Sequence, residues 1–261
     1  MKTLAVVILT RNEEDNIVEV VQNAKQCTEE VLIIDSGSTD NTQALAEEQG
    51  ARVCYHAWDG DFSAQRNFAI SVTEADWILY MDADERMRPE MVARIRQILQ
   101  QDGMEKQYRM KRKSVSFGVT FQHGVLYPDR VLRMFPRTQV HWVNKVHEHP
   151  ECALPVEDLP GYLEHYAYQS WQEWEEKLCR YTTIWAEDAY RHGKRTSLLG
   201  VFTHSVGGFC KMFFAKLGFL DGLLGSYLCC THFFYTMLKY LKLYERQQKE
   251  MQEAARSGRE P

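Results

Sequence analysis

Short apolar runs alternate with amphipathic segments through the N-terminal part of the chain. The runs are rich in β-branched residues, as expected of strands buried on both faces of a parallel sheet, and they occupy residues 4–9, 30–35, 51–54 and 77–81. Between them, apolar residues recur at helical spacing, for example at Ile17, Val20, Val21 and Ala24. Strands that alternate with helices through short loops form a doubly wound sheet with right-handed crossovers. We therefore predict an α/β fold, with helices on both faces of a mostly parallel sheet.

The pattern changes after residue 107. Residues 107–121 alternate in places, and two further strand-like segments cover 131–135 and 140–149. This part is expected to form a smaller mixed sheet that packs against the first. A long helix rich in Trp and Tyr is predicted over 169–192, and apolar residues with interspersed glycines dominate 198–243.

Three regions follow from these patterns. Residues 1–168 are expected to form the α/β domain, residues 169–248 a helical C-terminal region, and residues 249–261 a charged tail. Because charged chain ends make few apolar contacts, the last helix is expected to fray from about Arg246.

Composition narrows the class of protein. With 44% hydrophobic and 26% charged residues among 261, the chain is globular, and a formal charge of −5 gives no basic surface for nucleic acid. Its 7 cysteines are scattered without a C-x-x-C pair, which favours reduced thiols in the cytoplasm over disulfides or a zinc site. The apolar run 4–9 is short and meets Arg11, so it is interpreted as a strand and not as a signal peptide.

Three carboxylates, Asp82, Asp84 and Glu85, follow the strand predicted over 77–81. In open α/β sheets, ligands bind at the carboxyl ends of the strands. Two aspartates spaced i, i+2 there can both reach one hard cation, Mg²⁺ or Mn²⁺, whose other positions are taken by water and substrate phosphates. The alternative is a polar turn that caps the helix beginning near Pro89.

Other polar residues end neighbouring strands at the same edge. Asp35 closes the second strand and Thr10 the first, so the two side chains and Asp82 are expected to face one crevice. Asp35 could accept from a ribose hydroxyl or a base N–H, or it could cap the turn that follows it. In the helix before the 77–81 strand, Gln65 and Arg66 offer an amide and a cation. Arg66 suits phosphate charge, but a solvated helix face explains it equally well. The chain lacks the glycine motifs G-x-x-x-x-G-K-[ST] and G-x-G-x-x-G, so any nucleotide is held without a glycine phosphate cradle.

Four motifs in this order resemble the family 2 glycosyltransferases: VILTRNEE at 7–14, VLIIDSGSTDNT at 31–42, AQRN at 64–67 and YMDADE at 80–85. Later stretches resemble the branch that includes the lipopolysaccharide core β-1,4-glucosyltransferases: RVLRMFPR at 130–137, VHE at 146–148, HYAYQS at 165–170 and KMFFAKLGFLDG at 211–222. The similarity covers nearly the whole chain.

This resemblance implies a GT-A fold and the transfer of a sugar, with inversion, from a nucleotide-diphosphate donor, for which a UDP-sugar is the first expectation. Asp35 and Thr10 would contact the nucleoside. The wider donor site would also include Arg11, Asn12, Glu13, Gln65, Arg66, Asp82 and Ala83. Asp82 and Asp84 would be the Asp-x-Asp pair, with Asp84 the more direct ligand of a divalent metal. The metal would neutralise charge on the departing diphosphate.

Inversion also requires a base that takes a proton from the acceptor hydroxyl, and Glu148 is the candidate. On a strand, His147 and His149 would share one side and Glu148 would take the other; a structural carboxylate is the alternative. The resemblance further implies that His165 completes the metal shell, although a lone histidine is also common in a structural role. A zinc site is disfavoured because no regular spacing links its candidate ligands, which are His141, His147, His149, Glu151 and Cys152.

The apolar C-terminal region raises the question of a membrane. Residues 222–238 carry no Lys, Arg, Asp or Glu, but His232, the glycines and the flanking Asp221 and Lys239 make a poor spanning segment. Lys211 and Lys216 lie among apolar residues, as in interfacial helices: Phe209, Met212, Phe213, Leu217 and Phe219. A buried helical hairpin and a dimer contact are the alternatives.

The sequence thus predicts a metal-dependent, inverting transferase that adds a hexose, for instance glucose, to a glycolipid or lipopolysaccharide-core acceptor. It would be cytoplasmic and peripheral on the inner face of the membrane. One alternative is a nucleotidyltransferase, which would usually show a glycine-rich basic N-terminal loop, unlike residues 10–13 here. A non-catalytic sugar-nucleotide binder or membrane scaffold is the other, and the retained Asp82, Asp84 and Glu148 argue against it.

Overall fold

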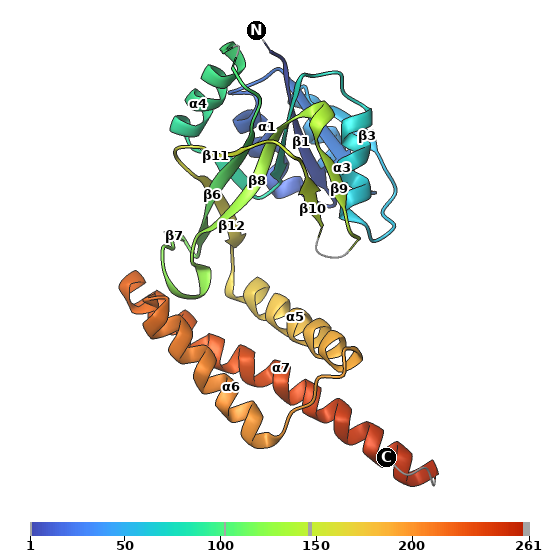
Figure 1. Cartoon of the computed structure of the whole chain (residues 1–261), viewed down its shortest axis with the longest axis vertical. Helices are drawn as coiled ribbons and strands as arrows, with labels where there is room; N and C mark the ends of the chain where they lie inside the picture. The colour runs from blue at the N-terminus through green and yellow to red at the C-terminus, as the bar shows by residue number, and fades with distance from the viewer. Residues whose placement is uncertain (1, 102, 146–147, 258–261) are drawn as a thin grey trace. The chain divides into compact units, whose positions relative to one another are not determined.

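The structure is a computed structural model that describes residues 2–101, 103–145 and 148–257 (Figure 1). It divides into two compact units. The sheet unit comprises Met1–Lys113 and Asp129–Tyr166, and the helical unit comprises Ser114–Pro128 and Ala167–Pro261. The short segment Ser114–Pro128 therefore belongs with the C-terminal helices, although it lies far from them in the sequence.

One sheet dominates the sheet unit, with the strand order β3-β2-β1-β4-β8-β6-β12-β5. Its first four strands are parallel: β1 (Leu4–Thr10), β2 (Glu30–Asp35), β3 (Arg52–Tyr55) and β4 (Trp77–Asp82). The sheet continues through β8 (Asp129–Pro136), which is antiparallel to both β4 and β6 (Gln107–Ser116), and then through the antiparallel pair of β12 (Leu163–Tyr168) and β5 (Glu85–Met87). Short β7 (Val119–Thr120) and β11 (Val156–Asp158) pair with β6.

The expectation of a separate, smaller mixed sheet is wrong. Met134, Phe135 and Pro136 of β8 pair directly with the beginning of β4, so the later strands extend the first sheet. Only β9 (His141–Val143) and β10 (His149–Glu151) form their own two-stranded piece among the described residues.

Helices cover both faces of the sheet: α1 (Glu14–Ala24), α2 (Thr42–Glu48), α3 (Phe62–Ser71) and α4 (Pro89–Gln100). Because side chains alternate along a strand, β1 sends Val6 and Ile8 into one apolar cluster and Val7 into another. The first cluster contains α1 and α4 side chains such as Ile17 and Ile95, and the second contains Ala69 of α3. The predicted α/β fold class, of GT-A type with a helical C-terminal region, is therefore confirmed.

The helical unit is built on α5 (Trp171–Arg191), α6 (Leu198–Cys210) and α7 (Gly222–Ser257). A π-helical turn (Lys211–Ala215) and a 3₁₀ turn (Gly218–Asp221) join α6 to α7, and two further 3₁₀ turns occupy Gly124–Leu126 in this unit and Arg137–Gln139 in the sheet unit. The segment expected to fray from Arg246 is helical as far as Ser257, and its start carries the Arg246–Glu187 ion pair and the Gln247–Thr196 hydrogen bonds; fraying of the tail stays a prediction.

Candidate active site

The ends of three parallel strands bring polar residues to one edge of the sheet. Thr10 pairs with Asp35 in the register of β1 and β2, and Leu9 pairs with Asp82 in the register of β1 and β4. The sequence-based prediction that Thr10, Asp35 and Asp82 meet at one edge is therefore correct in its geometry.

Asp35 is fully buried and organises the loop after β2. Its carboxylate accepts from the Thr10 hydroxyl at 3.0 Å, from the Gly37 and Ser38 amides at 3.0 and 2.9 Å, and from Gln43 Nε2 at 2.7 Å. Burial by itself raises the pKa of Asp35, but the hydrogen bonds from Ser38, Gly37 and Thr10 outweigh it and the pKa is lowered. Asp35 thus fills the capping role that the sequence left open, and its contact with a nucleoside stays a prediction.

Asn12 and Glu13 tie the loop after β1 to the loop after β2. Asn12 adopts a left-handed φ of 57°, in which its amide donates to Ser38 Oγ at 2.9 Å and its Oδ1 accepts from the Thr39 amide at 2.8 Å. The Glu13 amide donates to Thr42 Oγ1 at 2.7 Å. These contacts fix the two loops against each other.

A cavity of about 330 Å³ opens beside these loops. Its lining includes four predicted donor residues, Thr10, Arg11, Glu13 and Gln65, together with Leu9, Ser36, Trp58 and Phe62. Gln65 donates to the carbonyls of His56 and Ala57, which leaves its buried Oε1 without a partner. The sequence reasoning missed Trp58 and Phe62, whose rings pack edge to face at 4.6 Å. Their signal was two aromatic residues in an otherwise polar stretch.

Arginines surround Asp82, the first aspartate of the pair. Arg133 Nη2 lies 2.5 Å from Asp82 Oδ2, Arg66 Nη2 lies 3.6 Å from Oδ1, and Arg112 Nη1 lies 3.7 Å from Oδ2. Glu85 is fully buried, and its Oε1 accepts hydrogen bonds from the same Arg133 nitrogen at 2.9 Å and from Arg112 Nη1 at 3.2 Å. Its Oε2 also accepts from the Asp82 amide at 3.0 Å. The two carboxylates are therefore joined through shared arginines.

This cluster separates the pKa values of its two acids. Burial raises the pKa of Asp82, but the charges of Arg133 and Arg66 outweigh it and hold the pKa well below its usual range. For Glu85, burial and the nearby Asp82 charge outweigh Arg133 and Arg112, so its pKa is raised. Asp82 is therefore ionised at neutral pH, with its carboxylate engaged by arginines.

Asp84 has a different environment. Tyr166 N donates to the Asp84 carbonyl at 2.9 Å, and His165 pairs with Glu85 across β12 and β5, so the two chain segments lie together. His165 Nε2 lies 3.2 Å from Asp84 Oδ2, and both side chains are partly exposed. Ala83, which separates Asp82 from Asp84 in the sequence, is buried, and its carbonyl accepts a hydrogen bond from Arg86 Nη1.

Asp84 and His165 offer one carboxylate oxygen and one imidazole nitrogen that face each other. Such a donor pair suits a divalent cation such as Mn²⁺ or Mg²⁺, provided that phosphate and water supply the other ligands. Within the described ranges, no group of three or more His, Cys, Asp and Glu side chains is arranged to hold a metal ion, and this includes the described members of the zinc alternative. Of that set, His147 lies outside the described residues.

Glu148 lies in the connection between β9 and β10, so the prediction that it sits on a strand is wrong. Val146 and His147, which the same motif includes, are not among the described residues. Glu148 Oε1 lies 3.9 Å from Arg66 Nη2, and Arg66 therefore connects Glu148 with Asp82. The structure thus brings Glu148 into the arginine cluster.

Arg66 is 5% exposed, so its interpretation as part of a solvated helix face is wrong. Its guanidinium lies 4.5 Å from the Trp142 ring centroid and 5.3 Å from that of Tyr80. Burial and the neighbouring Arg133 charge lower the pKa of Arg66, although an arginine remains protonated at neutral pH. Two of its buried nitrogens, Nε and Nη1, have no hydrogen-bond partner.

Arg133→Met tests whether the arginine cluster supports the sheet. The variant leaves Asp82 and Glu85 without their shared counterion, so we expect a loss of about 3–5 kcal/mol in the free energy of unfolding. Denaturant unfolding followed by circular dichroism measures this loss. Arg109→Met, which removes an exposed ion pair with Asp158, is the control and should change little. Equal stability of the two variants would contradict the role given to Arg133.

Comparison with known proteins places this geometry in a family. The model of glycosyl transferase family 2 matches residues 5–150. An uncharacterised glycosyltransferase of Rickettsia typhi is 26% identical over 257 residues, covering 94% of this chain and 88% of the relative. The lipopolysaccharide core biosynthesis glycosyltransferase LpsC of Rhizobium meliloti is 27% identical over 255 residues, covering 93% and 92%.

Among solved structures, S. aureus TarS (residues 1–349) has a TM-score of 0.47 at 14% identity, covering 95% of this chain and 92% of that one. Glucosyl-3-phosphoglycerate synthase from Mycobacterium tuberculosis has a TM-score of 0.44 at 18% identity, covering 75% and 82%. The family match spans more than half of the chain, and the resemblance seen in the sequence motifs is confirmed. The protein belongs to glycosyl transferase family 2.

Proposed function

We propose that the protein is a metal-dependent, inverting hexosyltransferase that uses a UDP-sugar and a glycolipid acceptor of the lipopolysaccharide-core type. The observation that carries the proposal is the partly exposed Asp84–His165 pair, whose Asp84 lies close in the chain to an Asp82 that is paired with arginines. The acceptor class is supported by the similarity to LpsC, which extends over nearly the whole of both chains. Family membership argues against the nucleotidyltransferase alternative.

The cavity of about 330 Å³ beside the loops after β1 and β2 fits a nucleoside. Trp58 and Phe62 supply flat apolar surface for a base, and the unpartnered Oε1 of Gln65 can accept a base N–H. Uracil carries such an N–H donor, as thymine and guanine also do, so the contact is compatible with UDP. Arg11 at the rim adds positive charge for the phosphates.

Asp84 and His165 would hold the divalent cation, which, when bound, offsets the charge that develops on the leaving diphosphate. Asp82 remains a predicted ligand, but its pairing with Arg133 favours a supporting role. Its ion pairs and those of Glu85 fix the positions on either side of Ala83 and Asp84, so that the Asp84 carboxylate is held toward His165.

Glu148 is proposed as the base. Its carboxylate would take the proton of the acceptor hydroxyl while that oxygen bonds to the anomeric carbon and the bond from this carbon to the diphosphate oxygen breaks. Arg66 orients Glu148 by charge at 3.9 Å, and Arg66 is itself fixed by the Trp142 and Tyr80 rings. The partly exposed Glu148 side chain remains accessible to an acceptor.

The helical unit presents an apolar surface that we propose binds an anionic lipid bilayer, which would place the enzyme on the cytoplasmic face of the membrane. The exposed side chains of this apolar surface are Leu198, Leu199, Phe202, Val206, Phe214, Leu217, Phe219, Leu220 and Leu223. Lys211 and Lys216 are the charged residues between 196 and 220, and this segment contains no Asp or Glu. Apolar side chains beside an unbalanced positive charge suit a bilayer with anionic headgroups.

A surface orientation is favoured over spanning. Residues Leu198–Ala215 are long and apolar enough to cross a membrane by length and composition, with a mean hydropathy of 1.3. However, this 18-residue helix contains Lys211 and ends in a π-helical turn at Ala215, and Leu217 then adopts a left-handed φ of 54°. Only 11% of this segment is buried, which argues against the alternative of a buried hairpin.

Asp84→Ala tests the metal role. Without this carboxylate, Mn²⁺-stimulated release of UDP from a UDP-sugar should fall at least 100-fold, while the melting temperature without ligands should stay within a few degrees, because Asp84 is partly exposed. Asp158→Ala, an exposed carboxylate elsewhere in the sheet unit, serves as the control. Unchanged turnover and unchanged Mn²⁺ stimulation in Asp84→Ala would remove the metal role from this residue.

Glu148→Gln tests the base. Removal of a general base typically costs about 10²–10⁴ in rate, so transfer to the acceptor should slow by that factor while the dissociation constant for the donor stays near the wild-type value. Glu151→Gln alters an exposed carboxylate in the same hairpin and should transfer normally. A wild-type rate in Glu148→Gln would clear this residue of the proposed role.

Leu199→Glu combined with Phe202→Glu tests the bilayer contact. Each large apolar side chain contributes about 1.5–3 kcal/mol on burial, so the double variant should lose more than tenfold in co-sedimentation with phosphatidylglycerol vesicles. Ile184→Glu alters an exposed apolar residue on α5, outside the apolar surface, and should bind as the wild type does. The result that would contradict this prediction is a wild-type protein that does not bind vesicles but forms a dimer, if the double variant loses that dimer. The apolar surface would then be a contact with a second copy of the chain.

A further inference from the structure

A second pocket, of about 240 Å³, lies wholly within the helical unit. Its lining side chains come from the 3₁₀ turn at Gly124–Leu126, from the end of β12, from α5 and from α7. They are Val125, Tyr168, Trp174, Leu178, Tyr181, His232 and Tyr235. None of these residues belongs to the site described above.

The walls of this pocket are rigid aromatic surfaces. Trp174 is buried and packs edge to face on Tyr168 at 4.6 Å, within a cluster that includes Phe121 and Leu228. On the opposite helix, the His232 and Tyr235 rings are stacked at 5.6 Å. An aromatic wall fixed by its neighbours binds a flat or ring-shaped ligand at little cost in side-chain entropy.

The polar groups of the pocket are neutral. Burial raises the pKa of Tyr168 to about 12 and also raises that of Tyr235, so both hydroxyls keep their protons. Burial, together with the charges of Lys239 and Lys211, lowers the pKa of His232 to about 4, which leaves its ring uncharged at neutral pH. The lining thus carries no formal charge.

These polar groups are also available to a ligand. Tyr168, Tyr181 and Tyr235 all line this one pocket, together with His232. Among the hydrogen bonds of the described chain, none uses these three hydroxyls or the His232 ring nitrogens. Three tyrosines and one histidine of the lining therefore carry polar groups that no hydrogen bond of the described chain occupies.

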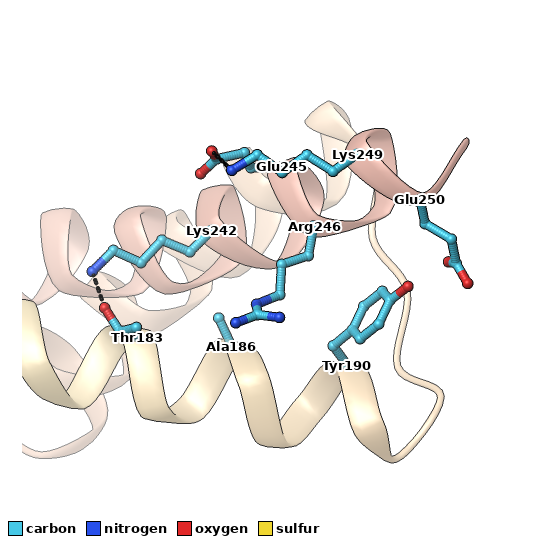
Figure 2. Close-up of a pocket in the computed structure, with 8 residues that line it drawn as sticks. All are labelled: Thr183, Ala186, Tyr190, Lys242, Glu245, Arg246, Lys249 and Glu250. Carbon is cyan, nitrogen blue, oxygen red and sulfur yellow. Dashed lines mark hydrogen bonds and ion pairs between the residues drawn. The ribbon is translucent and has the colours of Figure 1, made fainter. Parts of the chain in front are cut away.

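The nearby cavity between α5 and α7 provides a contrast (Figure 2). It measures about 690 Å³, but its charged groups already pair within the protein. Lys242 Nζ donates to Thr182 and Thr183 hydroxyls at 2.8 and 2.7 Å, and Lys249 Nζ lies 2.6 Å from Glu245 Oε1. A charged ligand there would have to displace these contacts.

The aromatic pocket selects its ligand by exclusion. A phosphate or carboxylate would find no cation among the lining side chains, since Lys177 and Lys239 lie over the Tyr168 and Tyr235 rings at 5.0 and 5.4 Å but do not line the pocket. An alkyl chain would offer no hydrogen bond to the partly buried polar groups of Tyr168, His232 and Tyr235. A neutral ring that carries several hydroxyls satisfies both the aromatic faces and the polar groups. The volume agrees, since a cavity of about 150 Å³ holds a benzene ring.

We propose that this pocket binds a single neutral sugar ring. The source of that ring rests on the proposed function: the acceptor of a glycosyltransferase is itself a saccharide, so the helical unit would recognise an uncharged sugar of the acceptor. The helical unit therefore contributes to acceptor selection, in addition to binding the bilayer.

Titration of the full-length protein with methyl β-D-glucopyranoside, without donor or metal, tests the proposal. Saturation-transfer NMR should detect saturable binding that Tyr181→Phe and Tyr235→Phe each weaken about tenfold, because each variant removes one hydroxyl and keeps the aromatic ring. Tyr240→Phe removes a hydroxyl from the same helix as Tyr235, outside the pocket, and should bind as the wild type does. Loss in the two pocket variants alone supports the proposal.

If the wild-type protein does not bind the glucoside, or if all variants bind it equally, the proposal of a sugar pocket is overturned. Binding of n-octanol that is indifferent to both hydroxyl removals, with no saccharide binding, would overturn it in favour of an alkyl ligand. Asp84→Ala separates the two proposals, since this variant should lose metal-dependent turnover and still bind the glucoside. Metal-independent turnover combined with hydroxyl-dependent glucoside binding would refute the metal role and leave the sugar pocket standing.

Discussion

A buried guanidinium holds the candidate active site together. Arg133 is 5% exposed on β8, and its Nη2 reaches both Asp82 at the end of β4 and Glu85 at the start of β5. Arg112 of β6 adds a second cation to the same two acids. Burying such charges costs several kcal/mol per ion, and only short, multiple hydrogen bonds offset this cost. The cluster therefore depends on the register of β4, β8 and β6.

The arginine cluster gives the acids at this edge different partners. Asp82 and Glu85 are engaged by arginines, and they flank Ala83 and Asp84 in the sequence. Because both ends of this turn are fixed, the Asp84 carboxylate is held beside His165, and both side chains remain partly exposed. Arg66 extends the same network to Glu148, so the proposed metal ligand and the proposed base depend on one set of buried cations.

The helical unit combines two kinds of surface on the same helices. Side chains on the outside of α6 and its following turns are apolar and exposed, whereas α5 and α7 enclose the aromatic pocket. Asp221, in the turn before α7, fixes the segment that contributes to the pocket. Its carboxylate accepts hydrogen bonds from the Gln122 and His123 amides at 3.0 and 2.7 Å. Those contacts hold the segment Ser114–Pro128, which carries Val125 into the pocket wall.

The sequence alone determined the parallel half of the sheet and the identity of the acids at its edge. Strands buried on both faces are continuous apolar runs, and a carboxylate that follows such a run must lie at the carboxyl edge, so Asp35, Asp82 and Asp84 could be placed from local pattern. Gln65 was likewise placed near the crevice from its position in the helix before the 77–81 strand, and it lines the cavity. Residue spacing cannot show which side chains from distant segments meet.

Only the tertiary structure decided how those acids differ. Arg112 and Arg133 lie in a region that the sequence assigned to a separate sheet, and the pairing of β4 with β8 brings them to Asp82. The same long-range packing buried Arg66 and moved Glu148 from a strand to a hairpin connection. It also gathered three tyrosines and a histidine from β12, α5 and α7 into one pocket. Charge pairing and burial are properties of residues far apart in the chain, and local hydrophobic pattern carries no record of them.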